Sequence, residues 1–162
     1  MQTLILPGYS KENKVWVDEV ANNIDVTGII RPFYWMHWTD ENSKFIPQEK
    51  ANLIVKHVKD ETVNIIAKSM GVFIASLVIN KIIDRVNKVI FCGIPANDMQ
   101  PDELDAVKDC VGLLGDRFLG IQNSNDPHGG FEDVKYFRNM ISKDGDNHNY
   151  PYYEDFREFL VS

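Results

Sequence analysis

The sequence contains few cysteines, and their placement excludes several kinds of site. Among 162 residues there are only two, Cys92 and Cys110. They form no CxxC pair, and no histidine lies near either of them at metal-ligand spacing. We therefore interpret both as reduced structural thiols, as expected in a reducing cytoplasm, and we predict neither a metal site nor a bound cofactor.

Basic clusters and long apolar runs are also missing. The net charge is -7 and lysines and arginines are not grouped, which argues against a nucleic-acid surface because phosphate binding needs clustered positive charge. The longest nearly uncharged apolar run, residues 70–80, is too short to cross a bilayer. Residues 1–7 lack the basic and long apolar parts of a signal peptide, so we expect a cytoplasmic protein without a membrane span.

The composition that remains is that of an ordinary globular protein. Hydrophobic residues make up 44% of the chain and charged residues 25%, and there is no low-complexity tract or internal repeat. A chain of 162 residues is long enough for one domain with a substantial core and too short for two comfortable ones. We therefore expect a single domain over residues 1–162.

Short apolar runs separated by longer amphipathic or apolar segments predict both strands and helices. Continuous apolar runs are typical of inner parallel strands, and they predict strands at residues 3–6, 63–66, 89–92 and 118–122. A further strand is expected at either 27–31 or 33–36. The spacing of apolar residues elsewhere predicts helices at about 14–24, 47–59, 72–83, 102–111 and 131–141.

The segment 66–72 joins a strand to a helix through a sharp turn around Ser69. Ala67 and Gly71, two positions before and after the serine, are small enough for such a turn, in which these residues pass close to neighbouring backbone. The pattern is A-x-S-x-G, a variant of the G-x-S-x-G nucleophile elbow. The alternative is an ordinary strand and helix, with Ser69 as the helix cap.

With this motif the chain resembles a small α/β-hydrolase, and the resemblance extends over nearly its whole length. Its other carriers are the loop Pro7-Gly8-Tyr9, the strand end at Asp126 and the late loop that ends at His148. Ser69, Asp126 and His148 occur in the chain order that α/β-hydrolases share. The chain departs from many relatives at Pro7, where they carry histidine, and at Ala67.

The resemblance implies both the fold and the roles of the site residues. It implies an α/β fold, a mostly parallel central sheet with helices on both faces and, in so short a chain, no cap domain. Ser69 would be the nucleophile, His148 the base and Asp126 the acid that orients the base. The backbone N–H groups of Tyr9 and Met70 would form the oxyanion hole.

The function implied is that of a carboxylesterase that cleaves small or medium acyl esters through an acyl-serine intermediate. Two alternatives use the same residues or the same fold. The chain could transfer the acyl group to an acceptor other than water, or it could have lost turnover and serve as a binding module. The oligomeric state and the physiological substrate stay open.

Several residues near these motifs have competing interpretations. His128 is interpreted as a loop residue near the site rather than the base. Asp146 is an alternative acid, but it lies only two positions from His148 and is poorly placed to reach its far ring nitrogen; the two also provide too few ligands for a metal. Asp126 could form a simple Asx turn. Trp35 and Trp38 could line an apolar pocket or belong to the core.

Overall fold

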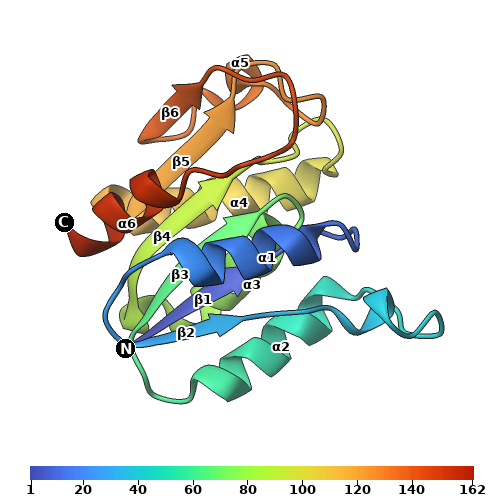
Figure 1. The fold of residues 1–162 in the computed structure, drawn as a ribbon, viewed down its shortest axis with the longest axis vertical. Coiled ribbons are helices and arrows are strands. Elements are labelled where there is room, and N and C mark those ends of the chain that lie inside the picture. The colour runs from blue at the N-terminus through green and yellow to red at the C-terminus, as the bar shows by residue number, and fades with distance from the viewer.

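The computed structural model describes all residues from 1 to 162 and contains one six-stranded sheet (Figure 1). Every neighbouring pair of strands is parallel, in the order β2-β1-β3-β4-β5-β6, which confirms the expected mostly parallel sheet. The strands are β1 (Gln2–Leu6), β2 (Ile29–Pro32), β3 (Val63–Lys68), β4 (Val86–Cys92), β5 (Phe118–Asn123) and β6 (Met140–Lys143).

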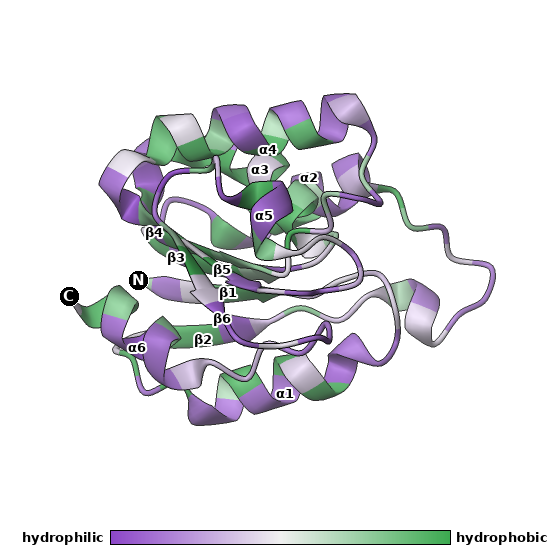
Figure 2. Cartoon of the chain, turned by 90° about the horizontal axis from the view of Figure 1, so that it is seen from above, coloured by the Kyte–Doolittle hydropathy of each residue, from purple (hydrophilic) through white to green (hydrophobic).

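Helices cover both faces of this sheet, as the sequence predicts. The α-helices are α1 (Asn13–Asn23), α2 (Pro47–Val58), α3 (Gly71–Ile82), α4 (Pro101–Leu114), α5 (Phe131–Val134) and α6 (Tyr153–Val161). Figure 2 shows α2, α3 and α4 on one face and α1 and α6 on the other. The first face holds a core cluster of 28 buried residues and the second one of 12, so the α1–α6 face is the thinner layer. No cap domain is present.

One prediction about the C-terminal third is wrong, and one helix there has no predicted counterpart. The predicted helix at 131–141 ends after one turn, at Val134, and its last two residues belong to β6. Asn139 has a positive φ of 52°, which breaks any helix there, and Met140 then pairs with Gly120 on β5. Helix α6 was not predicted at all. Of the two alternatives for the second strand, residues 27–31 match β2 better.

The carboxyl ends of all six strands point to the same edge of the sheet, because all six are parallel. The segments that follow β1, β3 and β5 carry the predicted site residues, and the loop after β6 carries His148. This edge is therefore where the site must be sought. No helix of the structure is long and apolar enough to span a membrane.

Candidate active site

Ser69 lies in the turn between β3 and α3, and its backbone is strained. Its φ of 56° is in the left-handed region, which costs a residue with a side chain about 1–2 kcal/mol. Two hydrogen bonds hold it there: the Ser69 N–H donates to the Cys92 carbonyl at 3.2 Å, and the Val72 N–H donates to the Ser69 carbonyl at 2.9 Å. The turn is thus as sharp as the sequence pattern predicts, and it leaves Ser69 half-buried at the strand end.

Two glycines make room for this turn. A Cβ atom on Gly71 would lie 2.3 Å from the Leu6 carbonyl oxygen and 2.6 Å from that of Pro7, both backbone atoms. A Cβ atom on Gly8 would lie 2.8 Å from Ser69 Cβ. Only glycine therefore fits at either position, because the loop after β1 crosses directly over the elbow.

The loop after β1 is held by indole N–H groups. Trp35 Nε1 donates to the carbonyl oxygens of Pro7, at 3.2 Å, and Gly8, at 3.0 Å. Trp38 Nε1 donates to the Tyr9 carbonyl at 2.7 Å. Both tryptophans are at least nine-tenths buried, so they are core residues that also fix the path of this loop.

The carbonyl groups of this loop accept hydrogen bonds from side chains, whereas the amide group of Tyr9 in the same loop has no acceptor. His37 Nε2 is a further donor to the Tyr9 carbonyl, at 2.8 Å. The Tyr9 and Met70 N–H groups donate no backbone hydrogen bond within the protein. Met70 also immediately precedes α3, whose N-terminal end carries partial positive charge. These are the two amides that the resemblance assigns to an oxyanion hole.

Asp126 and His148 lie together although 22 residues separate them. His148 Nδ1 is 2.6 Å from Asp126 Oδ2, and because a carboxylate only accepts, Nδ1 must carry the proton. The Asp126 side chain is fully buried and that of His148 is 19% exposed. In the neutral ring, the other nitrogen, Nε2, is therefore left as an acceptor.

Three donors surround the Asp126 carboxylate. Besides His148, the Tyr150 hydroxyl donates to Oδ2 at 2.5 Å and the His128 N–H donates to Oδ1 at 2.8 Å. Burial by itself would raise the pKa of Asp126, but these hydrogen bonds outweigh it and hold the pKa below its ordinary value. The carboxylate is therefore ionised at neutral pH. Asp126 therefore forms the Asx turn through Oδ1 and contacts His148 through Oδ2.

His148 Nε2 is buried and has no hydrogen-bond partner, so it makes no hydrogen bond to Ser69 in this structure. The two residues nevertheless flank the same strand end. Ser69 is bonded to the carbonyl of Cys92, and His148 Cε1 lies 3.0 Å from where a Cβ on the next residue, Gly93, would stand.

The loop that carries His148 is fixed by a side chain of β5. Asn123 Nδ2 donates to the carbonyls of Asn147, at 2.8 Å, and Asn149, at 2.9 Å, the residues on either side of the histidine. Asn123 is 1% exposed, so its bonds are shielded from water. The position of His148 along this loop is thus set by two carbonyl contacts that do not involve its own backbone.

The competing residues take other places. His128 lies near His148, with ring centroids 4.5 Å apart, and its Nδ1 is 2.5 Å from Asp98 Oδ2. Asp146 is exposed and makes no hydrogen bond to His148. No group of three or more His, Cys, Asp or Glu side chains is placed to hold a metal ion.

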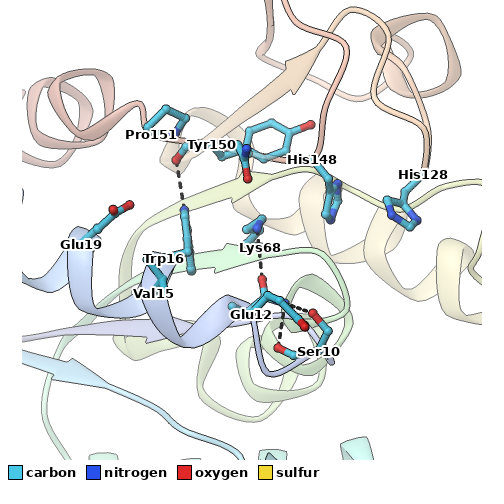
Figure 3. Close-up of a pocket in the computed structure, with 12 residues that line it drawn as sticks. Ser10, Glu12, Val15, Trp16, Glu19, Lys68, His128, His148, Tyr150 and Pro151 are labelled. Atoms are coloured by element: carbon cyan, nitrogen blue, oxygen red, sulfur yellow. Dashed lines mark hydrogen bonds between the residues drawn. The ribbon is translucent and has the colours of Figure 1, made fainter.

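A polar cleft of about 540 Å³ opens beside His148, between α1 and the loop before α6 (Figure 3). Ser69 does not line this cleft, but a Cβ atom on Gly8 would lie 2.8 Å from Ser69 Cβ and 3.0 Å from Nδ2 of Asn13, which does line it. The side chains that line the cleft include Asn13, Trp16, Lys68, His128, His148 and Tyr150.

Sequence reasoning missed Tyr150, Asn123 and Lys68. Tyr150 and Asn123 belong to no motif of the resemblance, and their contacts to distant segments of the chain leave no pattern in a single sequence. Lys68 could have been noticed, since a charged residue at the end of an otherwise apolar inner strand must be buried or face a ligand.

Comparisons with known proteins agree on the fold. No protein-family model matches the chain, and no curated protein matches it by sequence. Solved structures do match. A putative YdeN-like hydrolase from Pectobacterium atrosepticum has a TM-score of 0.68 at 14% identity, with 99% of this chain and 90% of that chain covered.

Two further structures extend the likeness. Est1E from Butyrivibrio proteoclasticus, solved with ferulic acid bound, has a TM-score of 0.70 at 12% identity, with 99% of this chain and 88% of that chain covered. The mouse α/β-hydrolase domain-containing protein 10 has a TM-score of 0.63 at 10% identity, with 99% and 88% covered. At such low sequence identities, structural similarity supports a shared fold and not a shared reaction.

Proposed function

Since the chain has the α/β-hydrolase fold, we propose that it is a serine hydrolase, a cytoplasmic carboxylesterase that acts on small or medium acyl esters within a single domain of residues 1–162. The observation that carries the proposal is the 2.6 Å contact of Asp126 with His148 Nδ1, which leaves Nε2 without a hydrogen-bond partner at the strand end that Ser69 also contacts. A small-molecule ester is the only partner that the proposal needs. Neither a cofactor nor a nucleic acid enters it.

The reaction would proceed through an acyl-serine. Ser69 Oγ attacks the ester carbonyl while His148 Nε2 takes its proton, and the tetrahedral intermediate then expels the alcohol, which receives that proton from His148. Water, activated by the same nitrogen, releases the acid and restores the serine. Asp126 keeps the ring in the tautomer that accepts at Nε2 and stabilises the imidazolium as it forms.

The oxyanion of both intermediates would be bound by the free N–H groups of Tyr9 and Met70. Removing one such donor typically costs about a hundredfold to a thousandfold in kcat. The indole bonds from Trp35 and Trp38 support this assignment, since they keep the carbonyls of the loop turned into the core. The start of α3 adds a favourable field for the developing charge.

The missing hydrogen bond between Ser69 and His148 is the one observation that favours a second reading, a hydrolase-like binding module without turnover. It does not decide against catalysis, because hydrogen bonds of catalytic groups are often long before substrate binds and shorten in the complex. Acyl transfer to an acceptor other than water would use the same residues, and product analysis with added alcohols separates it from hydrolysis.

Labelling with a fluorophosphonate probe tests the proposal. The intact protein should be labelled at Ser69, while Ser69→Ala and His148→Ala should lose labelling, the second because the serine is no longer activated. Ser76 on α3 provides a matched control, since it is a buried serine whose hydroxyl donates to the Phe73 carbonyl; Ser76→Ala should be labelled normally. An intact protein that folds and is not labelled would favour the binding module.

A further inference from the structure

Lys68 is the residue immediately before the proposed nucleophile, and its ammonium group is buried. Only 6% of the residue is exposed, although it ends an inner strand of the sheet. Its side chain lines the same cleft as His148, and Figure 3 shows it between Trp16 and His148. Its Nζ atom lies 5.6 Å from the centre of the Trp16 ring.

The hydrogen bonds of this ammonium are incomplete. It has three N–H donors and makes one hydrogen bond, to Asn13 Oδ1 at 3.1 Å. The direction of that bond is fixed, because Asn13 Nδ2 is occupied by two bonds to Ser10. No carboxylate lies within 4.0 Å of Lys68 Nζ, so it belongs to no ion pair. Burial lowers its pKa, while the charge of Asp126 opposes that change.

A buried charge without a counter-ion is costly unless something completes its contacts. We propose that Lys68, supported by Asn13, binds a carboxylate of the substrate, so that the preferred ester carries a free carboxylate close to the ester bond. The proposal deepens the esterase function above and rests on it for turnover. Because the serine and the lysine are neighbours at the end of β3, the substrate class that follows from the proposal is a monoester of a small dicarboxylic acid.

The surroundings favour a carboxylate over a more highly charged group. Lys68 is the only lysine or arginine along the cleft, and Glu12 and Glu19 are exposed on its wall. Their negative charges oppose a dianion such as a phosphate monoester more strongly than a single carboxylate, whose charge the one ammonium neutralises. The Trp16 Nε1–H already donates to the Tyr150 carbonyl, at 3.0 Å, so it is not available as a further donor to the ligand.

The test uses two esters that differ only in charge, monomethyl glutarate and its neutral amide, methyl glutaramate. Binding is measured first, by NMR titration of the Ser69→Ala protein, which needs no turnover. We expect monomethyl glutarate to bind at least about tenfold more tightly than the amide, the effect of one charge-assisted contact. Equal binding of the two esters would overturn the proposal.

Turnover of the same pair is then compared between variants. The intact protein should prefer monomethyl glutarate by at least about tenfold in kcat/KM, and Lys68→Met should bring this ratio close to one. Asn13→Asp provides a second variant that keeps the lysine, because the new carboxylate would lie beside Nζ and neutralise it. Lys108→Met, which removes an exposed lysine on α4, should leave the ratio as in the intact protein.

The outcomes separate this proposal from the esterase function. A Lys68→Met variant that loses activity on both esters by the same factor would overturn the carboxylate site and leave a lysine that supports the fold or the acid–base pair. An intact protein that binds monomethyl glutarate selectively but hydrolyses neither ester would support the carboxylate site and contradict the esterase function.

Discussion

The two sides of the site are held in place by different means. On one side, the path of the main chain sets the position of Ser69, through a bond to the Cys92 carbonyl and the close passage of Gly71 and Gly8. On the other, side chains set the position of His148, through Asp126 and the amide of Asn123. The first side is sensitive to added volume, the second to the loss of a polar atom. Four predictions, three substitutions and one pH dependence, sharpen or break this contrast.

The largest effect is expected from Asp126→Asn, on the side of the site that is held in place by side chains. The amide keeps the shape of the carboxylate but no longer fixes the tautomer or stabilises the imidazolium, and under the proposed function we expect kcat to fall by about a thousandfold to ten-thousandfold, as in hydrolases with a Ser-His-Asp triad. Hydrolysis of 4-nitrophenyl butyrate measures it. Asp146→Asn is the control, because Asp146 is exposed and makes no contact with His148. A large loss in the control instead would assign the acid to Asp146.

On the side of the site that is held in place by the main chain, Gly71→Ala should destabilise the whole protein. The new methyl group would stand 2.3 Å from a backbone oxygen, and neither segment can move without disturbing the elbow. We expect a loss of about 3 kcal/mol in the free energy of unfolding, seen as a lower urea midpoint. Gly112→Ala on α4, where nothing lies within 4 Å, should instead stabilise by about 0.5–1 kcal/mol. Equal effects of the two substitutions would contradict the close crossing at Gly71.

Tyr150→Phe should have a smaller effect, and it should lower both the activity and the stability of the protein. It removes a donor from Asp126 and an acceptor from the Asn123 N–H, both buried, at a cost of about 1–2 kcal/mol. We expect kcat to fall by about threefold to tenfold with KM little changed. Tyr136→Phe, whose hydroxyl makes no hydrogen bond and whose ring is exposed, should change neither quantity. An unchanged kcat in Tyr150→Phe would limit the tyrosine to a structural role.

The smallest effect concerns acid stability. The pKa of Asp126 is lower in the folded protein than in the unfolded chain, where it is about 3.9. Its contribution is therefore fully present above about pH 4 and is lost as the pH falls through the folded value. Urea unfolding between pH 6 and pH 2 should show a steeper loss for the intact protein than for Asp126→Asn, by at most about 1.4 kcal/mol per pH unit. Parallel curves would mean that this carboxylate is not stabilised by folding.

The contrast between the two sides also explains what the sequence could predict. The elbow depends on small residues at fixed spacing, so Ser69, Ala67 and Gly71 identify it within seven positions. Asp126 and His148 could be predicted as site residues because each follows a recognisable strand or loop in the expected order. Neither Tyr150 nor Asn123 could be found in this way, since neither belongs to a recognisable motif and each acts only through a contact to a distant segment of the chain.

The same distinction holds for the fold. Strands β1, β3, β4 and β5 are inner strands with nearly continuous apolar runs, and all four were predicted. Strand β6 lies at the sheet edge, has no fully buried residue and contains only two apolar residues, Met140 and Ile141, so its sequence has too little apolar character to indicate a strand. Helix α6 buries only Phe156 and Leu160, too short a pattern to distinguish it from a loop.

The burial of the two cysteines makes them reporters of local opening. Cys92 lies in β4 beneath the elbow, with Sγ donating to the Ala67 carbonyl, and Cys110 lies in α4 on the other face of the sheet. Burial raises the pKa of both thiols, to about 12 for Cys110, so a thiol reagent reacts only when the surrounding layer opens. The rate of reaction at Cys92 would then report opening of the strand beneath Ser69, and the rate at Cys110 would report opening around helix α4.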